Sequence, residues 1–154
     1  ILHIIFIISL TSLVAAYFIE YVLGHQPCNL CLIERIPYII GIILISINLI
    51  FNTNQKFLIL LLIMTFTFSI LISFYHFGIE QGFFDESMVC SLNNSKNIIT
   101  KEEILKQLSE ITISCKDVTF RIFGFSLTSI NILLNLFLVI LLAKIFKDYE
   151  KFKT

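Results

Sequence analysis

The sequence predicts an all-α integral membrane protein, a four-helix bundle that forms a single domain. Of its 154 residues, 57% are hydrophobic and 14% are charged, and the mean hydropathy is +0.92. A soluble chain of this length could not bury so much apolar surface. Four apolar runs reach the length of about 20 residues that crosses a bilayer. Because lipid offers the backbone no hydrogen bonds, these runs are expected to be helices.

Short polar segments separate the first three spans, and a long polar loop precedes the fourth. The spans are predicted at about residues 1–22, 33–52, 57–78 and 124–144. The first is expected to be a retained anchor, since no Lys or Arg precedes it and no small-residue cleavage site follows it. The formal net charge is zero, so the chain has no basic surface that would indicate nucleic-acid binding.

The number of spans decides which loops share a side of the membrane. Loops at about 23–32 and 79–123 lie on one side, and the 52–56 turn and the C-terminal tail lie on the other. All the cysteines therefore share one side: Cys28, Cys31, Cys90 and Cys115. Lysines in the tail favour a cytoplasmic C-terminus, although the opposite loops also carry basic residues. Paired cysteines favour an oxidising compartment, so we expect the cysteine loops to be extracytoplasmic.

The long second loop is predicted to contain a short amphipathic helix. Thr100 and Glu103 have the spacing of a capping box, a hydroxyl followed three residues later by a carboxylate. Apolar residues follow at helical spacing, namely Ile104, Leu105, Leu108 and Ile111. Such a helix would lie on the membrane surface or pack on the bundle.

A Cys-x-x-Cys motif stands where the second span begins. Cys28 and Cys31 lie one helical turn apart. At a helix N-terminus the helix dipole and the free N–H groups favour a thiolate. Arg35 follows Cys31 by four residues, on the same face, and adds a permanent positive charge; alternatively, it extends to the lipid headgroups as boundary arginines do. Glu34 is expected to pair with Arg35 or to orient it.

Three blocks of the chain resemble the DsbB family of bacterial disulfide-generating membrane proteins. Residues 24–38, GHQPCNLCLIERIPY, resemble the family signature. Residues 75–82, YHFGIEQG, lead to Cys90 as the family does at the start of its second periplasmic loop. The segment from Cys115 through FGFSL to Asn131 resembles the end of that loop.

The resemblance implies a membrane thiol-disulfide oxidoreductase, a dithiol:quinone reductase. Such proteins reoxidise a periplasmic thioredoxin-fold oxidase, DsbA, and pass its electrons to a membrane quinone, generating disulfides de novo. The implied cofactor is ubiquinone, with menaquinone as the alternative, and no metal. The implied location is the bacterial inner membrane, with the cysteine loops in the periplasm and the C-terminus in the cytoplasm.

The resemblance also implies a role for each cysteine. The partner's thiolate would attack the Cys90–Cys115 disulfide and form a mixed disulfide through Cys90. The electrons would then pass to Cys28 and Cys31, and the Cys31 thiolate would face the quinone.

Three further residues are expected at the quinone. Arg35 would donate a hydrogen bond to a quinone carbonyl and stabilise developing negative charge. His76, at the outer end of the third span, is a candidate for a second polar contact or a proton donor, with a plain interfacial histidine as the alternative. Glu34 completes this group. Asn131 and Asn135 are expected to form interhelical hydrogen bonds rather than to bind a ligand.

Other classes of protein are less consistent with the sequence. Zinc sites of the Cys₄ or Cys₂His₂ type usually pair two closely spaced motifs, whereas Cys90 and Cys115 are 25 residues apart. A purely structural role is disfavoured because a Cys-x-x-Cys disulfide closes too small a loop to stabilise the chain much. A vitamin K epoxide reductase-like enzyme would share the bundle and the chemistry, but its sequence blocks are not recognised.

Overall fold

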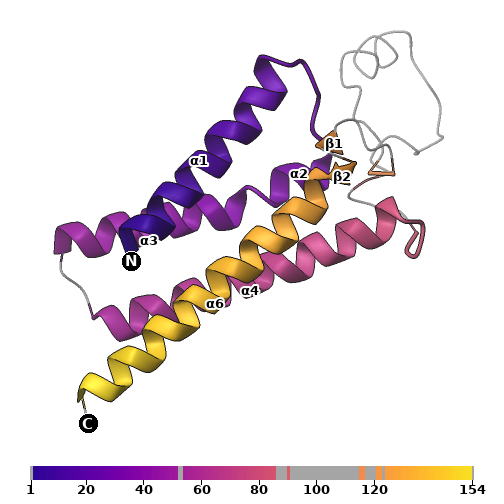
Figure 1. Cartoon of the computed structure of the whole chain (residues 1–154). Helices are drawn as coiled ribbons and strands as arrows, with labels where there is room; N and C mark the ends of the chain where they lie inside the picture. The colour runs from indigo at the N-terminus through magenta and orange to yellow at the C-terminus, as the bar shows by residue number, and fades with distance from the viewer. Residues whose placement is uncertain are drawn as a thin grey trace, which may run out of the picture.

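The computed structural model describes residues 2–51, 54–85, 90, 115–116, 121–122 and 124–153. It confirms the predicted all-α membrane bundle, because four helical segments are long and apolar enough to cross a membrane. Their elements are α1 (Leu2–Tyr21), α2 (Asn29–Ile33) with α3 (Ile36–Phe51), α4 (Gln55–Glu80) and α6 (Leu127–Lys153) (Figure 1). The amphipathic helix expected near residues 100–111 lies outside the described residues.

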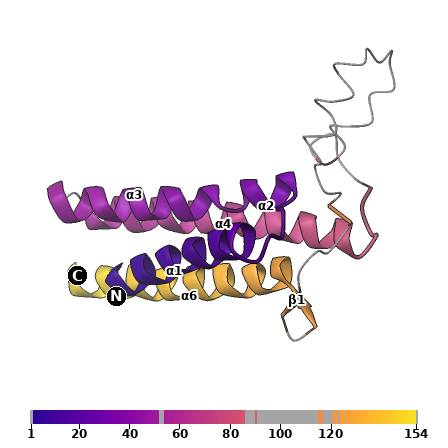
Figure 2. The same cartoon turned by 90° about the horizontal axis from the view of Figure 1, so that it is seen from above.

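The helices run along a common direction, and the cysteine loops lie at one end of the bundle (Figures 1 and 2). Both termini of the chain lie at the opposite end. The closest packing is between α4 and α6, and α3 packs against both α1 and α4. Helix α1 is not closely packed against α6. That separation leaves room for a cavity between them near the cysteines.

The bundle core is apolar, and so is much of the outer surface. Phe66 and Leu62 of α4 are fully buried against α3, where Gly41 permits the approach: a Cβ there would lie 3.1 Å from Phe66 Cζ. The other buried members of this core are Ile5, Tyr38, Ile45, Leu58, Ile59, Leu138 and Leu142. Outward-facing residues such as Val14 and Leu71 are more than half exposed. Lipid is the solvent in which such an apolar surface is stable.

The second span is broken between α2 and α3. Pro37 has no N–H with which to bond the carbonyl four residues earlier, that of Ile33, and α2 ends at that residue. The Arg35 N–H bonds instead to the Leu32 carbonyl, three residues back. The break places Glu34 and Arg35 at a turn in the middle of the site described below.

A small hairpin that the sequence did not suggest precedes α6. Strand β1 (Arg121–Ile122) pairs antiparallel with β2 (Phe125–Ser126). Gly124 in the connection has a φ of +87°, a conformation that glycine adopts at little cost. An apolar run of this length could equally extend the following helix, so periodicity alone did not distinguish the two structures.

Candidate redox site

Cys28 and Cys31 form a dithiol at the start of α2. Cys28 is the N-cap, and its Sγ accepts a hydrogen bond from the Cys31 backbone N–H at 3.3 Å. The two Sγ atoms are 2.8 Å apart and are not joined by a disulfide. Both sulfurs therefore lie in the first helical turn, where the helix dipole favours negative charge.

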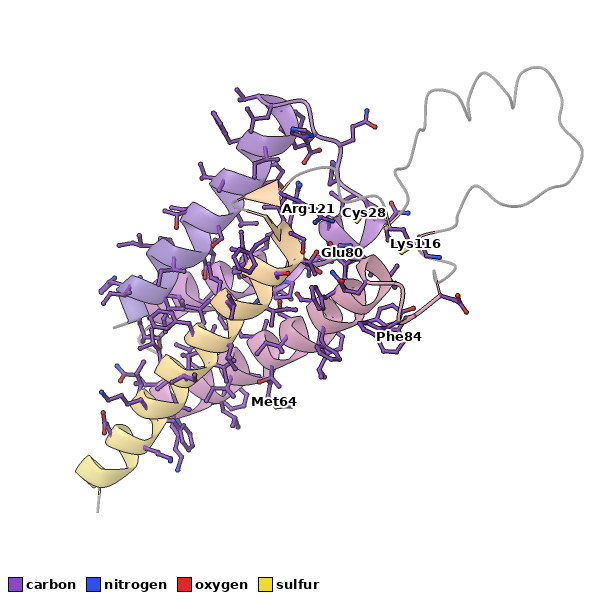
Figure 3. The ribbon with its side chains drawn as sticks, turned by 45° about the vertical axis from the view of Figure 1, so that its right-hand side comes forward. Cys28, Met64, Glu80, Phe84, Lys116 and Arg121 are labelled. Carbon is purple, nitrogen blue, oxygen red and sulfur yellow. A yellow bond between two sulfur atoms is a disulfide. The ribbon has the colours of Figure 1, made fainter. Side chains whose placement is uncertain are left out.

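The loop cysteines lie directly beside this dithiol. Cys90 and Cys115 are joined by a disulfide, with their Cα atoms 5.8 Å apart. Both are buried in one cluster with Cys28, Leu30 and Ile79. The Sγ atoms of Cys28 and Cys115 lie within 4.8 Å of each other. Figure 3 shows Cys28 near Lys116, the residue that follows Cys115. A small movement of Cys28 or Cys115 would therefore bring a sulfur of one pair into contact with a sulfur of the other.

His76 joins this cluster to Glu34. His76 Nε2 lies 3.5 Å from Cys28 Sγ, and Nδ1 lies 2.9 Å from Glu34 Oε1. Hydrogen bonds from Cys31 and then His76 lower the pKa of the Cys28 thiol to about 4, against the effect of burial, which raises it. Cys28 is therefore the sulfur of this dithiol that its surroundings favour as the thiolate.

Two further polar groups contact His76 from α4 and α6. Thr128 Oγ1 lies 3.3 Å from His76 Nδ1 and donates a hydrogen bond to Glu80 Oε1. That Glu80 oxygen is 3.9 Å from His76 Nε2. The imidazole is only 2% exposed. Contacts with residues of α2, α4 and α6 therefore fix the ring.

A cavity of about 280 Å³ adjoins the dithiol on its other side. It lies between α1 and α6, with α2 and the start of α3 at its base. Its polar groups include Cys31, Glu34 and Arg35, while Leu13, Ala16, Leu127, Ile130 and Leu134 are among its apolar walls. Cys28 and His76 do not line it. The two sulfurs of one dithiol thus face different surroundings, the loop disulfide and the cavity.

Arg35 is held by helix α1. Its Nη1 lies 2.5 Å from Glu20 Oε2, and its guanidinium stands 4.9 Å from the centroid of the Tyr17 ring. The side chain is 12% exposed, and α1 supplies both of these contacts. The expected pairing of Glu34 with Arg35 is not the one formed, because Glu34 bonds to His76 instead.

Asn131 connects three helices below the cysteines, as an interhelical hydrogen-bonding residue should. Its Nδ2 donates to Glu34 Oε2 at 2.9 Å and to Ser73 Oγ at 2.8 Å, and its Oδ1 accepts from the Tyr38 hydroxyl. Asn135 donates to Asn131 within α6, and its side chain also interacts with Tyr38 of α3. Asn131 therefore fixes the carboxylate that supports His76.

We expect Asn131→Ala to lower the free energy of unfolding by about 1 kcal/mol, because it leaves polar partners in the bundle without their hydrogen bonds. Thermal unfolding of the purified protein in detergent measures the change. Leu133→Ala is the matched control, since Leu133 lies on the same helix and is 63% exposed. Equal effects of the two substitutions would contradict a special role for the network.

The structure adds Tyr17, Glu20 and Thr128 to the residues expected from sequence. Glu20 had one visible signal, a lone carboxylate at the end of an apolar run. Its partner 15 residues later could be recognised only once α1 was known to pack against α3. Thr128 and Tyr17 carry no such signal, because threonine and tyrosine at the end of a span are common interfacial residues.

Four membrane-spanning segments with a dithiol and a disulfide in contact at one end define a multi-pass membrane protein of thiol-disulfide chemistry. The family described as disulfide bond formation protein DsbB matches residues 1–145, and the chain belongs to that family. It is thus a membrane disulfide oxidoreductase that functions in disulfide bond formation.

A bacterial relative is similar to the chain over most of its length. Uncharacterized protein RP370 of Rickettsia prowazekii (strain Madrid E) is 34% identical over 140 residues, which cover 90% of this chain and 81% of that protein. No solved structure matches the chain significantly.

Proposed function

We propose that the protein reoxidises a periplasmic, thioredoxin-fold DsbA-like oxidase and passes the electrons to a membrane quinone. The observation that carries this proposal is the two-sided dithiol. Cys28 lies within 4.8 Å of Cys115 of the loop disulfide, whereas Cys31 lines a cavity that also contains Arg35. Electrons can therefore be received on one side of the dithiol and released on the other.

The first exchange takes place at the loop disulfide. A thiolate of the reduced partner attacks Cys90, breaks the Cys90–Cys115 bond and releases Cys115 as a thiolate. The second thiol of the partner then attacks the mixed disulfide, so the partner leaves oxidised and Cys90 leaves as a thiol. Because both sulfurs are buried, the partner reaches Cys90 only when this cluster opens.

The second exchange moves the electron pair to the dithiol. Cys115 attacks Cys28 of a Cys28–Cys31 disulfide and releases Cys31 as a thiolate. Cys90 then attacks Cys115, which restores the loop disulfide and releases Cys28. After this step the dithiol carries the electron pair, and the Cys90–Cys115 disulfide is restored.

The cavity suits the head group of a quinone. Its volume approaches the lower end of the roughly 300–1,000 Å³ typical of ligand pockets, and its apolar walls end at a cationic donor and a thiol. A bound ubiquinone, or menaquinone as the alternative, supplies an acceptor for two electrons and two protons. Arg35 would hold a carbonyl oxygen through its guanidinium N–H groups.

His76 and Glu34 are proposed to accept and hold the proton that the Cys28 thiol loses. His76 Nε2 is placed to take the proton of Cys28 as that sulfur becomes a thiolate, and Glu34 orients the ring through Nδ1. Glu34 also lines the cavity. His76 is thus proposed to act at Cys28, with Glu34 as the link between the buried sulfur and the cavity.

The location follows from this chemistry. We propose the bacterial inner membrane, with the cysteine end of the bundle in the periplasm and both termini in the cytoplasm. A disulfide donor needs an oxidising compartment. The lysines that follow the last span from Lys144 onward belong to the end of the bundle opposite the cysteines (Figure 1), and basic residues beside a span favour the cytoplasmic side.

The decisive experiment mixes the purified full-length protein with ubiquinone and a reduced thioredoxin-fold oxidase. We expect quinone reduction, followed by its absorbance, to match partner oxidation one to one. Cys28→Ser should abolish both, because neither exchange with Cys115 nor closure of the dithiol remains. Oxidation of the partner without loss of quinone would contradict the proposed acceptor.

A further inference from the structure

The residues around Cys28 have a second chemical property, which does not depend on quinone. Cys28 Sγ, Cys115 Sγ and a ring nitrogen of His76 all lie within 4.8 Å of one another, and all three side chains are buried. Two sulfurs and an imidazole nitrogen are the ligands that zinc prefers. They come from three separate segments, so no sequence motif announces them.

We propose that reduction of the Cys90–Cys115 disulfide creates a buried zinc site formed by Cys28, Cys115 and His76, and that zinc holds the protein in its reduced state. With the disulfide intact, Cys115 has no thiolate to offer, and the thiolate is the ligating form. Reduction frees it. The site is therefore available in only one redox state.

The distances favour this arrangement. In a tetrahedral site with Zn–S near 2.3 Å and Zn–N near 2.0–2.1 Å, neighbouring ligand atoms stand about 3.6–3.8 Å apart. Cys28 Sγ and His76 Nε2 are already 3.5 Å apart. The remaining ligand atoms need to approach by no more than about 1 Å.

Charge and support also fit a divalent cation. Zinc would bind two thiolates, whose charges neutralise its own, and this removes most of the cost of burying an ion. A histidine that ligates a metal usually donates its other ring N–H to a carboxylate, which fixes the ring. His76 Nδ1 lies 2.9 Å from Glu34 Oε1. Water can occupy the fourth position, as it does in zinc sites with three protein ligands.

The consequence is inhibition that selects for the reduced enzyme. A zinc ion here would occupy Cys28 and Cys115, the two sulfurs that must exchange in the proposed cycle. Cys31 lines the cavity on the other side of the dithiol and is not a ligand.

The test measures Zn²⁺ bound to the full-length protein in detergent, with no quinone or partner protein added. We expect one tightly bound zinc per chain after chemical reduction and none in the oxidised protein. Co²⁺ in place of zinc should give thiolate charge-transfer absorption, which reports sulfur ligation directly.

Two matched variants separate ligation from loss of the disulfide. Cys90→Ser and Cys115→Ser break the same bond, but only the second removes one of the three proposed ligands. We expect reduced Cys90→Ser and Cys31→Ser to retain zinc, and Cys115→Ser to bind it at least about 100-fold more weakly. Glu34→Gln should weaken binding by about 10-fold, the lower end of the effect of losing such support.

Three results would overturn the inference. These are equal zinc binding by oxidised and reduced protein, equal binding by Cys90→Ser and Cys115→Ser, or loss of zinc in Cys31→Ser. The last would place the metal on the Cys-x-x-Cys dithiol. The zinc assay contains neither quinone nor partner, so a failure to bind zinc leaves the proposed function standing. A failure of the quinone assay likewise leaves the zinc site standing.

Discussion

We expect Cys115→Ala to stop turnover completely and to accumulate a covalent complex with the partner through Cys90. In this variant the Cys90 thiolate attacks a mixed disulfide between the partner's nucleophilic cysteine and a small thiol, releases the small thiol and forms a Cys90–partner disulfide, which no Cys115 thiolate can then open. Cys115 is 2% exposed and lies within 4.8 Å of Cys28, so it is the inner sulfur of the loop pair. The partner is supplied as this mixed disulfide, and its second cysteine is replaced so that it cannot resolve the bond to Cys90.

Non-reducing electrophoresis and mass spectrometry of the cross-linked peptides identify the sulfur that is used. The control is Cys90→Ala, which should give no complex and equally low turnover. A complex that runs through Cys28 would show that the partner bypasses the loop pair, and the order of exchange would then be wrong.

Arg35→Gln should lower kcat/KM for quinone by about 10²-fold, the scale of a lost electrostatic contact in an active site. The guanidinium offers donors in a fixed fork and keeps its charge at any relevant pH. Glu20 and Tyr17 hold it at the cavity beside Cys31. Lysine should restore only part of the activity, because its compact ammonium cannot reproduce both the fork and the contact with the ring.

Steady-state kinetics at matched protein levels decide this prediction. Glu20→Gln is the companion variant: it keeps the cation but removes its anchor, so we expect a smaller loss than in Arg35→Gln. If lysine is as good as arginine and quinone kinetics barely change, Arg35 serves only as a membrane-boundary residue. Normal exchange of the partner with the loop disulfide in Arg35→Gln would show that the variant is folded.

The fold and the grouping of the four cysteines could be predicted from sequence because they depend on local patterns. Apolar runs of bilayer length define the spans, and the Cys-x-x-Cys spacing places two sulfurs in one turn whatever the rest of the chain does. The parity of the spans was enough to put all four cysteines at one end. None of these inferences requires knowledge of which helices touch.

The partners of the polar residues could not be predicted, because they depend on helix packing. Glu34 lies next to Arg35 in sequence, yet Pro37 interrupts the helix and Glu34 bonds to His76 of α4. Arg35 finds Glu20 on α1. Likewise, His76 lies beside Cys28 and does not line the cavity that contains Cys31 and Arg35, an arrangement that depends on the packing of α4.

The burial of the sulfur cluster also limits which thiols can reach its sulfur atoms. Cys28, Cys90 and Cys115 are each no more than 6% exposed, and Cys31 is partly exposed and lines the cavity. Small thiols dissolved in water meet little sulfur surface to attack, however reactive they are. A protein that can open the cluster by binding it gains access that a free thiol lacks. The choice of thiol would then depend on recognition of the partner protein. Small soluble thiols would not reduce the loop disulfide in its place.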